Sequence, residues 1–182
     1  MKPCSLFMGI LGAVLLASTV YAQASAVPGD LKQAYNGVKN DILQAAEKMP
    51  DADYSYMPTP QERNFGGWVA HVAEAQMGAC SGINGARKRS DAGSKTSKAD
   101  LVAALKESFD ECDKAIDGTT ESNMNDPVPS FRGQTPRIAA LFGNISHDNE
   151  CYGNMAVYLR MKGIVPPSTE MMQKLRGGKK KK

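Results

Sequence analysis

Apolar residues recur every three or four positions in four long segments of this 182-residue chain. This spacing gathers them on one face of an α-helix, whereas a half-buried strand would show them at every second position. The sequence contains no strand-period alternation of any length and no internal repeat. Four amphipathic helices with one long connection predict an all-α fold, a four-helix bundle with a short extra helix at the C-terminus.

Capping residues and prolines set the expected limits of the first two helices. The first helix is predicted to begin at the N-cap Asp30 and to end at Pro50, which disfavours helical geometry in the residue before it. The second helix is expected to start from Asn64 or from Thr59 and to continue to about Ile83. Both helices are thus placed by local chemistry.

The third predicted helix begins after Ser97, a good N-cap, and stops at Gly118. Residues 119–134 follow and are rich in Asn, Asp, Pro, Ser and Gly. These residue types favour turns, so we expect a long loop between the third and fourth helices.

The fourth helix has the clearest predicted start, with Thr135 as N-cap and Pro136 at the first helical position. It is expected to run to Lys162, with Gly163 as its stop. A short last helix is predicted to end at Leu175.

The N-terminal residues have the pattern of a targeting segment. Lys2 gives a positive start, an apolar run covers residues 6–17, and residues 20–22 form a small-x-small cleavage pattern. The apolar run is too short to span a bilayer comfortably, so we expect no stable membrane insertion after cleavage. The sequence therefore predicts a signal peptide at 1–22 and an exported chain, periplasmic in a bacterium.

The rest of the chain is long enough for one domain, which we expect at 23–176, followed by a flexible basic tail at 177–182. The formal net charge of +3 includes Lys2 and the four lysines of the tail, and without these five charges the folded part carries −2. This charge does not imply a basic surface for nucleic acid, so we expect no nucleic-acid partner. A homodimer through exposed apolar helix faces is an open alternative.

Three cysteines follow the predicted signal peptide: Cys80, Cys112 and Cys151. An oxidising compartment favours one disulfide with one thiol left over. From the residues alone, all three pairings are open.

The chain has only two histidines, His71 and His147. His147 and Cys151 are four residues apart, which stacks their side chains on one face of a helix. These two groups and one residue from a neighbouring helix can make a three-ligand metal site with an open position. Spacing alone still favours the simpler interpretation, in which both histidines lie at the surface or in a seam between helices.

Several motifs give the chain a resemblance to a known family. They are Met57-Pro58-Thr59-Pro60, Ala70-His71-Val72-Ala73-Glu74-Ala75-Gln76, Asn144-Ile145-Ser146-His147-Asp148-Asn149-Glu150 and Tyr158-Leu159-Arg160-Met161-Lys162-Gly163. Through them, nearly all of the chain after residue 22 resembles the DinB family of four-helix-bundle metalloenzymes. The part on the fourth helix is the most specific.

The resemblance implies a divalent metal ion held by three histidines, one on the second helix and a pair four apart on the fourth. His71 and His147 match two of them, and Cys151 stands in the place of the third. Zinc accepts imidazole and thiolate together, so zinc or nickel is expected as the cofactor. The implied activity is metal-dependent hydrolysis or thiol transfer on an unidentified small-molecule substrate. The alternative is a metal-free binding or structural bundle.

The predicted bundle also favours one disulfide. Cys80 and Cys112 lie on consecutive, antiparallel predicted helices, and a bridge between them would leave Cys151 free to bind metal. The alternative is that both cysteines are buried as small apolar residues.

Three carboxylates lie close to the histidines in the sequence, namely Glu74, Asp148 and Glu150. Any of them can orient an imidazole or serve as a general base. We expect each to be an ordinary solvated helix residue.

Overall fold

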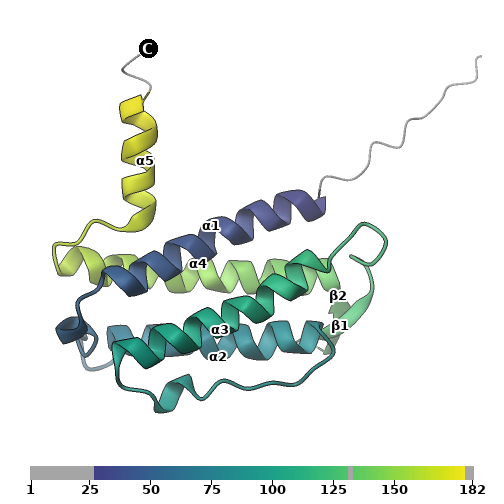
Figure 1. The fold of residues 1–182 in the computed structure, drawn as a ribbon, viewed down its shortest axis with the longest axis horizontal. Coiled ribbons are helices and arrows are strands. Elements are labelled where there is room, and N and C mark those ends of the chain that lie inside the picture. Colours follow the sequence, from purple (N-terminus) through teal and green to yellow (C-terminus); the bar gives the residue numbers. More distant parts are fainter. Residues whose placement is uncertain (1–26, 131–132, 179–182) are drawn as a thin grey trace, which may run out of the picture.

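Four long helices lie side by side, and a fifth projects away from them (Figure 1). The computed structural model describes residues 27–130 and 133–178. The predicted signal peptide and the last four lysines lie outside these residues. The elements, in chain order, are α1 (Val27–Lys48), α2 (Phe65–Ile83), α3 (Lys98–Asp117), β1 (Pro127–Ser130), β2 (Gly133–Pro136), α4 (Arg137–Met161) and α5 (Pro167–Gly178), with short 3-10 helices at Asp51–Asp53 and Ala92–Ser94.

The predicted bundle is confirmed. Helix α2 packs most extensively against α3, and α1 against α4, while α2–α4 and α1–α3 contacts close the ring. The largest fully buried side chains include Tyr35, Phe65, Phe109 and Met155, one or more from each of the four helices. Each contributes about 1.5–3 kcal/mol when it is removed from water, so the apolar stripes hold the four helices together.

The expected caps of α2 and α3 are confirmed. Asn64 precedes α2, and its side-chain oxygen accepts a hydrogen bond from the Gly67 amide at 2.7 Å. Ser97 precedes α3 and accepts from the Asp100 amide at 3.1 Å. The predicted start of α1 is wrong by three residues, because the helix begins at Val27 and places Asp30 in its first turn.

The loop expected at 119–134 instead contains a β-hairpin, and the predicted cap of α4 is also wrong. Thr135 pairs with Val128 across two short antiparallel strands, so α4 begins only after Pro136. Gly133 has a φ of 94°, a value open to glycine but strained for other residues. Strands of four residues are too short to show an alternating pattern, so the two strands could not be predicted from periodicity.

Helix α5 leaves the bundle after a turn at Gly163. It extends to Gly178, three residues beyond the predicted end at Leu175 and into the segment expected as a tail. An ion pair between Lys48 and Glu170 connects it to α1. None of the helices in the described residues is long and apolar enough to cross a membrane.

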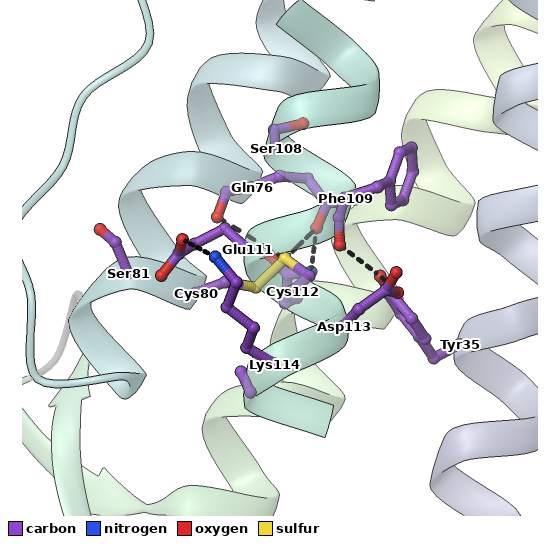
Figure 2. Close-up of a disulfide and its surroundings, with 12 residues drawn as sticks. Tyr35, Gln76, Cys80, Ser81, Ser108, Phe109, Glu111, Cys112, Asp113 and Lys114 are labelled. Atoms are coloured by element: carbon purple, nitrogen blue, oxygen red, sulfur yellow. Dashed lines mark hydrogen bonds and ion pairs between the residues drawn. A yellow bond between two sulfur atoms is a disulfide. The ribbon is translucent and has the colours of Figure 1, made fainter. Parts of the chain in front are cut away.

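The predicted disulfide joins α2 to α3, as Figure 2 shows. Cys80 and Cys112 form this bridge, and both side chains are fully buried. Cys151 is left as a free, buried thiol. The bridge therefore fixes the helix that carries His71 while leaving the third sulfur available.

Reduction of this bridge is expected to destabilise the protein by about 3–4 kcal/mol, because the bridge closes a loop of 32 residues. The measurement is equilibrium denaturation with and without a reductant. The double variant Cys80→Ser/Cys112→Ser should already be destabilised and should not respond to reductant. An unchanged unfolding curve for the reduced wild type would contradict the prediction.

A second, ionic link joins α3 to the segment that follows α2. The side chain of Glu111 is only 5% exposed and accepts hydrogen bonds from Lys88 at 2.8 Å and from Asn84 at 2.8 Å. Lys88 first and then Asn84 lower the pKa of Glu111 to about 2, from a usual value of 4.5. A carboxylate with a lowered pKa in the folded state stabilises the protein above its unfolded pKa.

We therefore expect Glu111→Gln to lower the free energy of unfolding at pH 7, and the difference from wild type to shrink as the pH falls from 4.5 towards 2. Denaturation at a series of pH values measures this difference. Asp117→Asn is the matched control, since Asp117 pairs with Lys32 at an exposed site and should contribute little. A constant difference at every pH would contradict the assigned role of the charge.

Candidate metal centre

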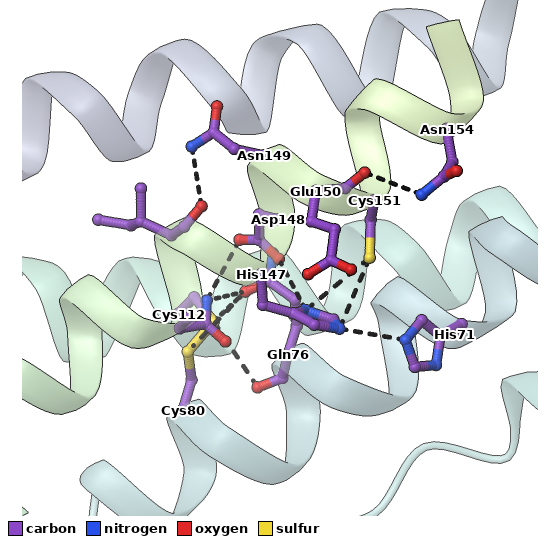
Figure 3. Close-up of polar contacts among 12 residues, drawn as sticks. His71, Gln76, Cys80, Cys112, His147, Asp148, Asn149, Glu150, Cys151 and Asn154 are labelled. Atoms are coloured by element: carbon purple, nitrogen blue, oxygen red, sulfur yellow. Dashed lines mark hydrogen bonds and ion pairs between the residues drawn. A yellow bond between two sulfur atoms is a disulfide. The ribbon is translucent and has the colours of Figure 1, made fainter. Parts of the chain in front are cut away.

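The three predicted ligands converge between α2 and α4 (Figure 3). His71 Nε2 lies 3.1 Å from His147 Nε2, and Cys151 Sγ lies 3.6 Å from the same His147 nitrogen. One ligand atom from each residue can be chosen so that all three lie within 4.8 Å of one another. Two helices far apart in the sequence thus bring both histidines and the free thiol to a common point.

The two separations measured from His147 Nε2 fit a tetrahedral metal. Zinc bonds of about 2.0–2.1 Å to nitrogen and about 2.3 Å to sulfur put two nitrogens about 3.3 Å apart and a nitrogen and a sulfur about 3.6 Å apart. The observed distances of 3.1 Å and 3.6 Å are close to these values. The donor set also suits zinc chemically, because imidazole and thiolate are both ligands of this ion. The residues present therefore fit the implied metal.

Helix periodicity explains why these side chains face the seam. The buried face of α4 carries a stripe that includes Leu141, Ile145, Tyr152 and Met155. His147 lies at the edge of this stripe, and its side chain is 33% exposed. Cys151 is turned further inward and is 1% exposed. The core therefore holds the centre in place, yet both imidazoles are only partly buried and keep contact with solvent.

A buried carboxylate stands behind His147. Asp148 has no exposed surface, and its Oδ1 lies 3.8 Å from His147 Nδ1. This is too long for a hydrogen bond, and Oδ1 has no hydrogen-bond partner among the described residues. With Nε2 facing the other two ligands, Nδ1 is the ring atom that faces Asp148. A carboxylate in this position typically orients a metal-binding imidazole.

Two buried amides continue this polar arrangement towards the disulfide. Asn144 Nδ2 donates to Asp148 Oδ2 at 3.2 Å and to Gln76 Oε1 at 3.0 Å. Gln76 lies on α2 beside the Cys80–Cys112 bridge, as Figure 3 shows. A row of buried polar side chains therefore connects the disulfide to His147.

Local charge favours a cation at this centre. Asp148 first, and then Cys151, raise the pKa of His147 to about 10, because an acidic partner stabilises the positively charged imidazole. Burial lowers the pKa of His71, and the positive charge of Arg63 lowers it further. Burial also raises the pKa of Asp148, an effect that His147 opposes. A metal ion would replace the proton that the acidic side of the site holds on His147.

The neighbouring carboxylates differ in role from one another. Glu74 is exposed and accepts a hydrogen bond from the Gly93 amide at 2.9 Å, and Glu150 is also exposed, as expected for solvated residues. The same expectation is wrong for Asp148, because it faces the core.

Asn144 and Gln76 were not predicted from the sequence as partners of the site. A signal for both was present in the sequence, because each is a polar residue at a position that belongs to the apolar stripe of its helix.

A cleft of about 620 Å³ lies beside His71, which forms part of its lining. Its lining includes Arg63, His71, Glu74 and Lys95, together with the small residues Gly67 and Ala70 of α2. This volume is in the range that small-molecule sites occupy. Of the three candidate ligands, His71 is the one that lines this cleft, so a small molecule in the cleft can reach His71.

Comparison with known proteins places this chain and its fold in a family. The sequence profile described as the DinB superfamily matches residues 34–153, which include His71, His147 and Cys151. A DinB-like protein from Bacillus cereus ATCC 10987 has a similar crystal structure, with a TM-score of 0.65 and 18% identity over 76% of this chain and 95% of the other. At this identity the likeness shows a shared fold. No curated protein matches significantly. The chain belongs to the DinB superfamily.

Proposed function

We propose that this protein is an exported metalloprotein that binds one divalent metal ion, zinc or nickel, through His71, His147 and Cys151. The observation that carries the proposal is the convergence of two imidazole nitrogens and one sulfur at separations suited to a tetrahedral ion. Three protein ligands leave a fourth position for water or substrate, which is the arrangement of catalytic rather than structural zinc.

A metal bound here would supply Lewis acidity and would lower the pKa of a coordinated water or thiol. The chain's own residues would hold the imidazoles and admit the substrate. Asp148 would fix the orientation of His147, and the cleft beside His71 would receive a small molecule. Metal-dependent hydrolysis or thiol transfer is the reaction class that suits this arrangement.

Export is supported by the signal-like pattern of residues 1–22 and is compatible with the disulfide between Cys80 and Cys112, a bond typical of oxidising compartments. The proposed location is the periplasm if the source is bacterial. An exported protein is separated from the genome, and the formal charge of the folded part is not basic, so we propose no nucleic-acid partner.

One observation favours a second candidate, a metal-free binding or structural bundle. The His71 and His147 nitrogens are 3.1 Å apart, a distance at which one imidazole can donate a hydrogen bond to the other. In that candidate the two rings close the seam by themselves, and Cys151 is a small buried residue.

The two candidates differ in metal stoichiometry. The mature protein, purified without a histidine tag and loaded with zinc, is expected to retain about one ion per chain after dialysis. His71→Ala, His147→Ala and Cys151→Ala should each lose most of this metal, because each removes one of three ligands. Elemental analysis by mass spectrometry and a folding check by circular dichroism measure the result.

Glu74→Gln is the matched control, since it removes an exposed carboxylate one helical turn after His71 and should keep the metal. Retention of zinc by all three ligand variants would place the metal elsewhere. No retained zinc in the wild type would favour the hydrogen-bonded pair of imidazoles.

Asp148→Asn is expected to weaken zinc affinity about 10- to 100-fold while leaving all three ligands in place, because a neutral amide orients and polarises His147 less well. Competition with a chromophoric chelator measures the affinity. Glu150→Gln removes one acidic charge from the next position, which is exposed, and should have a much smaller effect. Equal losses in the two variants would mean that only net charge matters.

A further inference from the structure

The cleft beside His71 contains one positive side chain without an acidic partner in the described part of the chain. Arg63 lines the cleft and is exposed, and no carboxylate lies within ion-pair distance of its guanidinium among the described residues. Its backbone is fixed, because the Arg63 carbonyl accepts a hydrogen bond from Tyr158 at 2.5 Å. An anchored arginine at the wall of a cleft has its donors available for a ligand.

The other charged side chains of the cleft already have partners. Lys95 pairs with Asp91 at 2.9 Å, and the carboxylate of Glu74 accepts from the Gly93 amide. Of the two cations, Arg63 and Lys95, that line the cleft, Arg63 is therefore the one that no described carboxylate pairs with, while Glu74 keeps its negative charge in its hydrogen bond to the neutral amide. Guanidinium groups bind planar or tetrahedral oxyanions through two parallel hydrogen bonds, which makes carboxylates and phosphates the ligands that fit best.

Aromatic contacts hold Arg63 in line with the proposed metal centre. Its guanidinium carbon lies 5.0 Å from the centroid of the Trp68 ring, within the range of a cation–π interaction. The rings of Trp68 and His71 pack in a T-shaped arrangement with their centroids 6.0 Å apart, and His71 contacts His147. Arg63 and His71 line the same cleft, so a molecule bound to Arg63 would extend along the cleft towards His71.

Small residues of α2 line the cleft between Arg63 and His71. Gly67 and Ala70 lie on α2 between Arg63 and His71 and belong to the lining. A side chain at Gly67 would meet Asn64 Oδ1 at 3.0 Å and Arg63 Cβ at 3.4 Å. Glycine at this position thus lets the arginine lie close to the helix and leaves room for a ligand above it.

We infer that the cleft along α2 is an oxyanion site, in which Arg63 binds the carboxylate or phosphate of a small molecule whose other end points to the centre at His71. The orientation towards the centre rests on the proposed function, whereas the oxyanion contact does not. The substrate class is therefore a small anionic molecule.

Trp68 is the only tryptophan of the chain and lies against Arg63, so its fluorescence reports on the cleft. The metal-free full chain is titrated with succinate and with inorganic phosphate at constant ionic strength, and with succinamide as the neutral counterpart of succinate. We expect saturable binding of at least one anion and none of succinamide. Arg63→Gln should weaken this binding at least tenfold, and the tighter of the two anions identifies the preferred oxyanion.

Arg176→Gln is the matched control, because it removes an equal charge from an exposed site on α5 and should leave binding unchanged. Equal binding in wild type and Arg63→Gln, no binding of either anion, or binding of succinamide as tight as that of succinate would overturn the inference. Because this titration uses no metal, it is independent of whether zinc binds.

The orientation is tested by repeating the succinate titration with zinc-loaded protein. A dicarboxylate held at Arg63 with its other end at the centre should bind more tightly when zinc is present, and His147→Ala should abolish the gain. Zinc that binds without changing succinate affinity would overturn the orientation while leaving the proposed metal site intact.

Discussion

The contact between α2 and α4 brings His71 within 3.1 Å of His147, and the chemistry proposed for this protein depends on that approach. The approach is imposed by packing rather than by the ligands, since buried residues flank them on both helices, such as Val72 on α2 and Ile145 on α4. The disulfide adds a covalent restraint by fixing α2 to α3. A metal ion would therefore meet ligands already in position, which lowers the conformational entropy lost on binding.

Polar side chains buried between α2 and α4 lower the stability of the fold. Asp148, Asn144 and Gln76 occupy core positions where apolar side chains would pack without any polar group to satisfy. The Asp148 Oδ1 and Gln76 Nε2 atoms have no hydrogen-bond partner among the described residues, and each such buried atom costs about 1–3 kcal/mol. A cation next to His147 would offset part of this cost, because it strengthens the attraction between the imidazole and the carboxylate. Polar residues retained in a core at such a cost are typical of functional sites.

Much of this architecture could be predicted from the sequence, because it follows from local chemistry. The caps Asn64 and Ser97 and the apolar stripes specify α2 and α3 residue by residue. The hairpin could not be predicted, since the pairing of Val128 with Thr135 is a contact between short segments without a periodic pattern. The same pairing explains why α4 does not begin after Thr135, since this residue, although a good local N-cap, lies in β2 instead.

The three candidate ligands could also be predicted from the sequence. The four-residue spacing of His147 and Cys151 is visible in the sequence, and the resemblance to DinB proteins added His71. Asp148 was one of three carboxylates that could orient an imidazole, but it was expected to be solvated, although the apolar stripe of α4 has a gap at this position, between Ile145 and Tyr152. Whether an acidic residue in such a gap faces solvent or a neighbouring imidazole depends on the packing of α4 against α2. Spacing along one helix does not contain that information.

X-ray absorption spectroscopy of the zinc-loaded protein tests the proposed set of ligands, because it reports the ligand atoms themselves. We expect a first shell with one sulfur at about 2.3 Å and two imidazole nitrogens at about 2.0–2.1 Å, completed by a light atom from water. A first shell of oxygen and nitrogen alone, without sulfur scattering, would contradict it, because Cys151 would then not belong to the centre.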